Sequence, residues 1–220
     1  MNTLSNILLV IGCQRSGTSL LASMLGRHSE INMLYESTTT DSLFTIGKKY
    51  SGNKLLAWRQ IRWDKRASRI GHLMNRLINA DFGRRRRHHR VRLFPTSKLS
   101  LKDYLDVNGR IIVITRNKVD VIKSIVRRTQ MSAYQAEREY DRSMKLISKL
   151  HHVALLIQFN DLVSRPEAIM KGVCRYLGLE YESRMLEGPR FNYVYPRAVF
   201  ESRTTPSIAL VALGDQPATS

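Results

Sequence analysis

The feature that most constrains the fold is a short apolar run that ends in a glycine-containing loop. Residues 6–12 (NILLVIG) are apolar and rich in branched side chains, which is typical of a strand buried in a parallel sheet. The loop GCQRSGTS (12–19) follows, and the apolar residues after it repeat at helical spacing up to Leu25, with Gly26 as the expected helix end. This order of strand, tight loop and helix predicts the first unit of an α/β sheet.

Further apolar runs predict three more strands, at residues 31–34, 110–115 and 153–159. The run at 110–115 precedes an apolar helical stripe, and a long charged helix is expected over 131–152. Ser164 is the expected N-cap of a last helix, which Gly178 closes. Strands that alternate with helices predict a parallel sheet with helices on both faces, which is a three-layer α/β fold.

The length of 220 residues fits one such domain, which we expect to span residues 1–205. Residues 54–92 interrupt the pattern, because they hold 13 Lys or Arg against two acidic residues, a net charge of +11. We interpret this stretch as a basic helical insertion whose arginine-rich run at 84–90 repels itself and forms a mobile loop. The nearly uncharged tail, 206–220, contains two prolines and is expected to be poorly ordered.

Charge and cysteine content indicate the kind of partner and the compartment. The chain carries 36 Lys or Arg and 18 Asp or Glu, so its net charge of +18 attracts anions. Two cysteines, Cys13 and Cys174, make at most one bridge, which favours a reducing compartment over a disulfide framework. The apolar run at 7–11 is too short for a signal peptide or a membrane span, so we expect a cytoplasmic protein without a transmembrane segment.

The loop at residues 12–19 has the glycine spacing of a phosphate-binding loop. Its glycines let successive backbone N–H groups point at one anion, and the following helix adds the positive end of its dipole. A nucleoside triphosphatase has a lysine before the final Ser or Thr, but this chain has Thr18 there, which disfavours that activity. The cationic side chain of the loop is Arg15, which can bind a phosphate or sulfuryl group through two N–H donors.

The stretch Arg15-Ser16-Gly17-Thr18-Ser19-Leu20-Leu21 resembles the 5′-phosphosulfate loop of sulfotransferases that use 3′-phosphoadenosine 5′-phosphosulfate (PAPS). The run at 111–117 with Ser124 resembles the 3′-phosphate motif of that family, and residues 159–163 and 176–179 resemble its later segment. The resemblance implies a fold like that of P-loop-containing nucleoside triphosphate hydrolases. It also implies that PAPS is the donor and adenosine 3′,5′-bisphosphate (PAP) the product. The donor-binding residues that it implies are Arg15, Ser16, Gly17, Thr18, Ser19, Arg116 and Ser124.

The same resemblance assigns catalytic roles to Glu36, Arg15 and Lys98. Glu36 matches the general base of carbohydrate and tyrosylprotein sulfotransferases, which removes a proton from the attacking hydroxyl. The alternative is a surface glutamate that only pairs with one of the many arginines of the chain. Lys98 looks like the lysine that stabilises charge on the bridging oxygen. No metal is expected, because the histidine pairs at 88–89 and 151–152 lack the spacing of zinc ligands.

The sequence leaves the acceptor and two other function classes open. A hydroxyl on a glycan, a lipid or a tyrosine is expected, and the basic insertion would suit an acidic glycan or peptide. A nucleic-acid-binding protein is a second hypothesis, because clustered Lys and Arg bind phosphate backbones, but few aromatic residues interrupt the insertion and nucleic acid is disfavoured. A small-molecule kinase with a P-loop-like fold is a third, disfavoured by Thr18.

Overall fold

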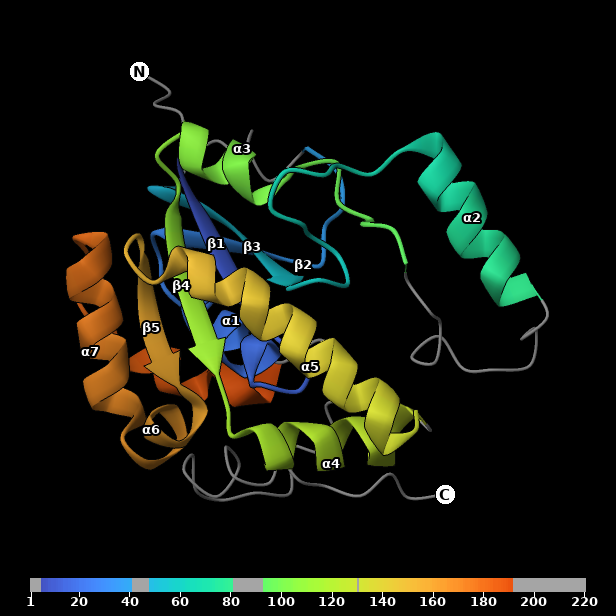
Figure 1. Ribbon diagram of the computed structural model, residues 1–220. Coiled ribbons are helices and arrows are strands. Elements are labelled where there is room, and N and C mark those ends of the chain that lie inside the picture. The colour runs from blue at the N-terminus through green and yellow to red at the C-terminus, as the bar shows by residue number, and fades with distance from the viewer. Residues whose placement is uncertain (1–4, 41–47, 81–92, 130, 192–220) are drawn as a thin grey trace.

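A five-stranded parallel sheet forms the centre of the protein (Figure 1). The computed structural model describes residues 5–40, 48–80, 93–129 and 131–191. The strand order is β2-β3-β1-β4-β5, so β1 lies between two neighbours. The strands are β1 (Asn6–Gly12), β2 (Ile31–Tyr35), β3 (Tyr50–Leu56), β4 (Arg110–Thr115) and β5 (Ala154–Gln158). Every neighbouring pair runs parallel.

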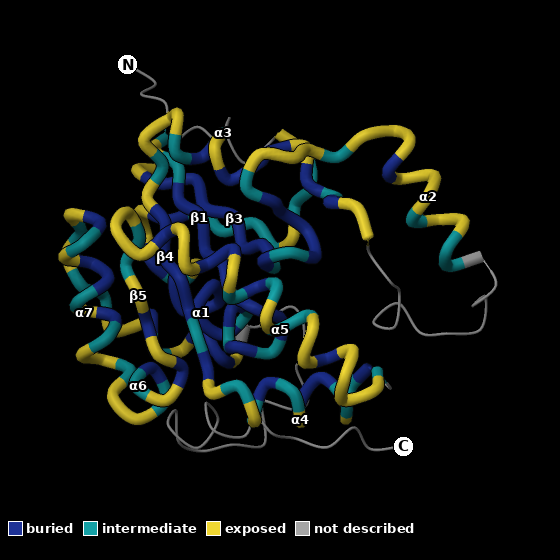
Figure 2. Tube along the Cα trace, viewed as in Figure 1, coloured by how far each residue is buried: buried dark blue, intermediate teal, exposed yellow. Residues whose placement is uncertain are grey.

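Helices cover both faces of the sheet, which confirms the three-layer α/β fold (Figure 1). The helices before β5 are α1 (Thr18–Leu25), α2 (Arg69–Ala80), α3 (Leu101–Asp106), α4 (Lys118–Thr129), α5 (Ala133–Ile147) and the 3-10 helix η3 (Ser148–Leu150). After β5 come α6 (Phe159–Ser164), α7 (Pro166–Leu177) and η4 (Ser183–Phe191). Alternate residues of β1 face opposite layers: Leu8 packs with α1 and α7, and Leu9 packs with α3 and α5. Figure 2 shows that these central strands are buried.

The strands expected at 6–12 and 110–115 are confirmed as β1 and β4, and those expected at 31–34 and 153–159 correspond to β2 and β5. The strand β3 was not predicted, because its residues YSGNKLL include several poor strand formers. The strand lies between β2 and β1, where hydrogen bonding to both neighbours outweighs its weak propensity. Residues 54–56 of the expected insertion therefore belong to the sheet, and the helix within the insertion is α2. The expected loop at 84–90 and the tail 206–220 lie outside the described residues.

Of the three helix ends expected from the sequence, those at Gly26 and Gly178 are confirmed and the one at Ser164 is wrong. Gly178 ends α7 in the left-handed conformation, with φ 64°, as predicted. Ser164 is not the N-cap of α7, because it is the last residue of α6 and Arg165 precedes the helix. Proline disfavours helical geometry in the residue before it, so the break falls at Arg165. Gly26 follows α1 with a right-handed φ of −66°, and the chain continues through a turn.

Among the residues that the structure describes, no helix has both the length and the apolar character needed to cross a bilayer. The cytoplasmic location stays a prediction.

Helix α5 corresponds to the long charged helix expected over 131–152 and starts with a capping box. In this box the Ser132 side chain accepts a hydrogen bond from the backbone N–H of Gln135, whose own side chain accepts one from the Ser132 N–H.

We expect Ser132→Ala to lower the free energy of unfolding by about 1 kcal/mol, because the N–H of Gln135 loses its acceptor. Urea unfolding followed by circular dichroism measures the change. Ser148→Ala, at the other end of the same helix, is the control and should cost less, because the Ser148 hydroxyl only donates to the exposed carbonyl of Lys145. Equal losses for the two variants would show that the capping box does not set the helix start.

Candidate functional site

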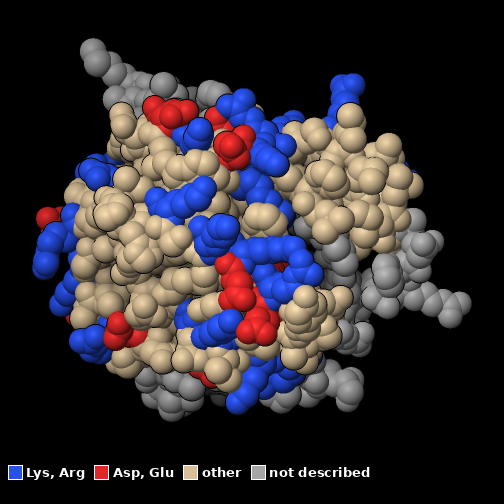
Figure 3. All heavy atoms as spheres, viewed as in Figure 1, with Lys and Arg blue, Asp and Glu red and all other residues tan. Residues whose placement is uncertain are grey.

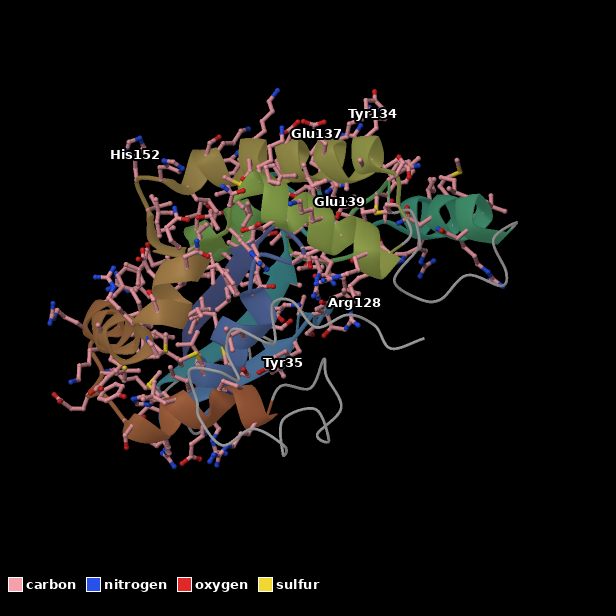
Figure 4. The ribbon with its side chains drawn as sticks, turned by 90° about the horizontal axis from the view of Figure 1, so that it is seen from below. Tyr35, Arg128, Tyr134, Glu137, Glu139 and His152 are labelled. Carbon is pink, nitrogen blue, oxygen red and sulfur yellow. The ribbon has the colours of Figure 1, made fainter. Side chains whose placement is uncertain are left out.

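The candidate site lies where the parallel strands end, which is the edge at which α/β sheets bind ligands. Figure 4 looks onto this end of the molecule, where Tyr35 marks the end of β2 and Arg128 lies in the last turn of α4. In the sheet, Gly12 at the end of β1 is paired with Leu56 of β3 and Ile114 of β4. The segments that leave these three strands therefore start side by side.

Two glycines give the loop between β1 and α1 its shape. A Cβ at Gly12 would lie 2.5 Å from the Ile114 carbonyl oxygen, so only glycine fits beside β4. At Gly17 the φ of +98° is unfavourable for other residues, and a Cβ would lie 2.4 Å from Cδ2 of Phe159. At both glycines the loop is thus packed closely against the ends of β4 and β5.

The predicted 5′-phosphosulfate residues lie together at the start of α1. The Ser16 hydroxyl donates to the Cys13 carbonyl at 2.6 Å, and the Ser16 N–H donates to the same oxygen at 3.2 Å, which closes the loop into a turn. Helix α1 begins at Thr18 with Gly17 as its N-cap. The first N–H groups of a helix have no partner within the helix and carry the positive end of its dipole. Residues 16–19 therefore form a cradle suited to an anion.

The two predicted anion-binding motifs meet through Arg15 and Ser124. Arg15 has a φ of 68°, and its Nε donates to the hydroxyl of Ser124 at 3.0 Å, although the residues are 109 positions apart. Ser124 is buried on α4. Arg116 is also buried, at the end of β4, with its guanidinium carbon 4.4 Å from the ring centroid of Phe159. The Phe159 ring thus lies close to both Gly17 and Arg116 and joins the two motifs.

Glu36 follows β2 and forms an ion pair that the sequence analysis did not identify. One carboxylate oxygen lies 2.5 Å from Nζ of Lys54, and the other accepts a hydrogen bond of 2.6 Å from Nε2 of Gln60. The Lys54 side chain is 2% exposed, whereas that of Glu36 is 40% exposed. The alternative considered from the sequence was a surface glutamate that only pairs with an arginine. It is correct in part, because Glu36 forms an ion pair, but its partner is the buried Lys54. Pairing leaves the carboxylate accessible, so it does not exclude the role of a base.

Gln60 organises the surroundings of this carboxylate. Its side-chain oxygen accepts from the Leu56 N–H at 2.7 Å, which fixes the amide so that its NH₂ group faces Glu36. Its backbone carbonyl accepts from the N–H groups of Thr96 and Ser97. The next N–H, that of Lys98, donates to the carbonyl of Thr38 at 2.8 Å.

Lys98 therefore lies on a segment next to the Glu36 loop, with an exposed side chain, and its catalytic role stays a prediction. Lys54 and Gln60 were missed because both fall in the basic stretch interpreted as an insertion. The sequence does contain a signal for a strand here, because the residues that follow Lys54 include the apolar Leu55, Ala57 and Ile61, and all three belong to the core.

A buried polar network supports the other side of the phosphate loop. Arg59 donates to the side-chain oxygen of Gln14 at 2.5 Å and lies 3.4 Å from a carboxylate oxygen of Glu139, which reaches in from α5 (Figure 4). Burial raises the pKa of the Cys13 thiol to about 12, and the carboxylate of Glu139 adds to the shift. Because a protonated thiol is a poor nucleophile, Cys13 is a packing residue of the loop. Cys174 is likewise a buried free thiol.

Within the described parts of the chain, no group of three or more His, Cys, Asp or Glu side chains could hold a metal ion. The cations close to the phosphate loop are arginines, and a lysine lies beside Glu36. His151 and His152 are exposed on the turn after η3 (Figure 4 labels His152). His88 and His89 lie outside the described residues.

The model of the sulfotransferase family matches residues 8–94 of the chain. The sulfotransferase domain of the Synechococcus PCC 7002 olefin synthase is 16% identical with a TM-score of 0.53, covering 100% of this chain and 90% of that one. Mouse sulfotransferase SULT7A1, complexed with PAP, is 12% identical with a TM-score of 0.52, covering 93% of this chain and 69% of that one. Comparison with curated protein sequences gives no match.

These findings confirm the resemblance to sulfotransferases that the sequence motifs indicate. At such low identity the solved structures demonstrate the fold alone, whereas the family match supports a transferase that moves sulfuryl groups. The matched residues include Arg15, Glu36 and Lys54 but not Arg116 and Ser124. The assignment of the second motif therefore depends on the sequence pattern and the contacts described above.

We expect Gly17→Ala to destabilise the protein by about 1–3 kcal/mol and to weaken PAP binding, because the new methyl group meets Phe159 and the left-handed φ becomes strained. Gly172→Ala is a matched control, since nothing lies within 4 Å of its would-be Cβ in the middle of α7. That change should stabilise the protein by about 0.5–1 kcal/mol. Denaturant unfolding and calorimetry measure both effects, and a neutral Gly17→Ala would show that the loop adapts to a side chain.

Proposed function

We propose that the protein transfers a sulfuryl group from PAPS to an acceptor hydroxyl and releases PAP. The observation that carries the proposal is the hydrogen bond from Arg15 Nε to Ser124 Oγ, because it unites two anion-binding motifs at one edge of the sheet. A donor with phosphate groups at two positions needs two such sites close together. The sulfotransferase family match and the PAP complex of a protein with the same fold support this assignment.

The residues fit the two ends of the donor. The cradle of residues 16–19, with Arg15 beside it, suits the 5′-phosphosulfate, because the first N–H groups of α1 have no partner within the helix and Arg15 adds a positive charge. Arg116 and Ser124 suit the 3′-phosphate, since a guanidinium and a hydroxyl can both donate to its oxygens. Phe159 packs against the guanidinium of Arg116, whose Nε also lies 3.9 Å from a carboxylate oxygen of Asp120 in α4.

Glu36 would act as the general base of the transfer. The acceptor oxygen forms a bond to sulfur, its proton passes to the Glu36 carboxylate, and the bond from sulfur to the phosphate oxygen breaks. Lys54 and Gln60 hold the two carboxylate oxygens in place, so the base is oriented before the acceptor arrives. Arg15 and the N-terminus of α1 would stabilise the charge that develops on the leaving phosphate.

Two lysines are candidates for the positive charge next to the reacting groups. Lys98 is the residue expected from the resemblance, and Lys54 is the lysine that contacts Glu36. Both lie near the loop after β2, and each would add positive charge on the acceptor side.

We propose a hydroxyl on a glycan, a lipid or a tyrosine as the acceptor. Incubation of the protein with labelled PAPS and a panel of glycans, lipids and phenols tests the activity, and PAP release without labelling of any hydroxyl compound would contradict it.

Replacement of Arg116 by Ala should reduce PAP affinity at least tenfold, because charge-assisted hydrogen bonds to a phosphate contribute about 1.5–3 kcal/mol each. AMP, which lacks the 3′-phosphate, should bind the variant and the parent protein nearly equally. Isothermal calorimetry with both nucleotides measures the difference. Arg110→Ala, at the opposite end of β4, is the control and should bind both nucleotides as the parent does. Equal loss of PAP and AMP affinity would remove Arg116 from the 3′-phosphate site.

Replacement of Glu36 by Gln keeps the shape of the side chain and removes its basicity. The single-turnover rate at saturating PAPS should fall about a hundredfold to ten-thousandfold, while PAP affinity changes little. Glu167→Gln is the matched control, since Glu167 also pairs with a lysine, Lys171, but lies on α7 away from the loop. If Glu36 serves only to neutralise Lys54, the Gln variant will instead lose stability and keep its rate.

A further inference from the structure

Helix α2 carries several large apolar side chains that are exposed to solvent. Ile70 is 74% exposed, Leu73 54% and Leu77 55%, with Met74 also exposed. Spacings of three and four residues place all four side chains on one side of the helix. Figure 1 shows α2 standing apart from the sheet, and Figure 2 shows most of its length as exposed. An apolar surface of this kind on a globular protein marks an interaction site.

The segment that begins at Leu93 packs against the other side of α2, because Asn75 lies roughly 150° around the helix from the middle of the apolar stripe. Leu93 and Phe94 are themselves exposed, and both N–H groups donate to the side-chain oxygen of Asn75 in α2. The Asn75 amide donates in turn to the Phe94 carbonyl at 3.0 Å. The four apolar side chains on the opposite side of the helix are left exposed, and we call them the α2 patch: Ile70, Leu73, Met74 and Leu77. On the face seen in Figure 3, this region is mainly uncharged.

The charged residues of α2 itself have one sign. Helix α2 contains no acidic residue, and its Arg69 and Arg76 are exposed. Each precedes an apolar residue of the patch by one position, so on the helix it lies about 100° around from that residue, at the side of the apolar stripe. Just before the helix, Asp64 and Lys65 are both exposed, so their charges cancel and the arginines decide the sign. The apolar surface is therefore bordered by cations, within a chain whose net charge is +18.

We propose that the α2 patch binds the surface of a membrane that contains anionic lipids. An amphipathic helix with arginines beside its apolar side binds in this way, with the apolar side chains in the acyl boundary and the cations among the headgroups. With 12 residues, α2 is about 18 Å long, too short to cross a hydrocarbon core of about 30 Å, so it lies in the plane of the interface.

Charge favours the membrane over the other possible occupants of the α2 patch. A second copy of the chain would bring its own Arg69 and Arg76 close to those of this helix, whereas anionic lipid neutralises them. Single-stranded nucleic acid binds aromatic side chains by stacking, but the patch on α2 itself is aliphatic. This binding is independent of the proposed reaction, because none of the patch residues belongs to the phosphate loop or contacts Glu36.

Co-sedimentation with sucrose-loaded vesicles tests the proposal on the full chain. Vesicles of phosphatidylcholine mixed with phosphatidylglycerol should bind the protein, and phosphatidylcholine alone should bind it much more weakly, with added salt weakening the first interaction. The double variant Leu73→Gln, Leu77→Gln should bind the mixed vesicles at least about tenfold more weakly. Val153→Gln is the control, because Val153 is apolar and about as exposed as Leu73 and Leu77 but lies before β5. This variant should bind the mixed vesicles as the parent protein does.

A second variant tests the charge contribution separately. Arg69→Gln with Arg76→Gln should weaken binding to the mixed vesicles and flatten its salt dependence. Circular dichroism and the PAP affinity of each variant verify that the fold is retained. Equal vesicle binding by the parent and both double variants would overturn the proposal, and so would absence of binding by the parent. A dimer in sedimentation velocity that Leu73→Gln, Leu77→Gln dissolves, without vesicle binding, would assign the patch to a second copy instead.

Discussion

The pairing of β1 with both β3 and β4 is the constraint on which the candidate site depends. Because Gly12 is in register with Leu56 and with Ile114, three chain segments leave the sheet at one level. The strand register alone then makes neighbours of three segments: the phosphate loop, the turn that carries Gln60 and the segment that carries Arg116. A shift of one residue in either ladder would turn the side chains of a strand to the opposite face and separate these segments. The chemistry of the site is thus fixed by backbone hydrogen bonds in the core.

The ion pair between Glu36 and Lys54 links the fold to the proposed reaction. A lysine inside a sheet is stable only when its charge has a partner, and here the partner is a carboxylate that remains accessible. Gln60 then holds the second carboxylate oxygen and, through its backbone, the segment that leads to Lys98. The same contacts that satisfy a buried cation therefore orient the residue proposed as the base. Stability and turnover are expected to be coupled at this position.

The sequence predicts the parts of the structure in which local pattern and tertiary packing agree. β1, β4 and the loop at 12–19 are predicted well, because buried parallel strands are continuously apolar and a phosphate loop needs glycine at fixed positions. β3 escapes prediction, since the buried Ser51, Asn53 and Lys54 are acceptable only with partners supplied by other elements. The contact between Arg15 and Ser124 is likewise a product of the sheet order, which spacing along the chain does not reveal. The Ser164 cap fails because the geometry before Pro166 moves the break by one residue.

The close contact between η4 and α1 has a consequence for the order in which the protein folds. A Cβ at Gly188 would lie 2.4 Å from Cα of Met24, so η4 packs directly on the backbone of the helix that follows the phosphate loop. Just after that helix, the N–H of Ser29 donates to the carboxylate of Glu182, 153 residues further along the chain. Helix α1, which begins at the anion cradle, is therefore packed on one side by a segment that is synthesised much later than the helix itself. We expect α1 of a nascent chain to reach its final packing only after this segment has emerged from the ribosome.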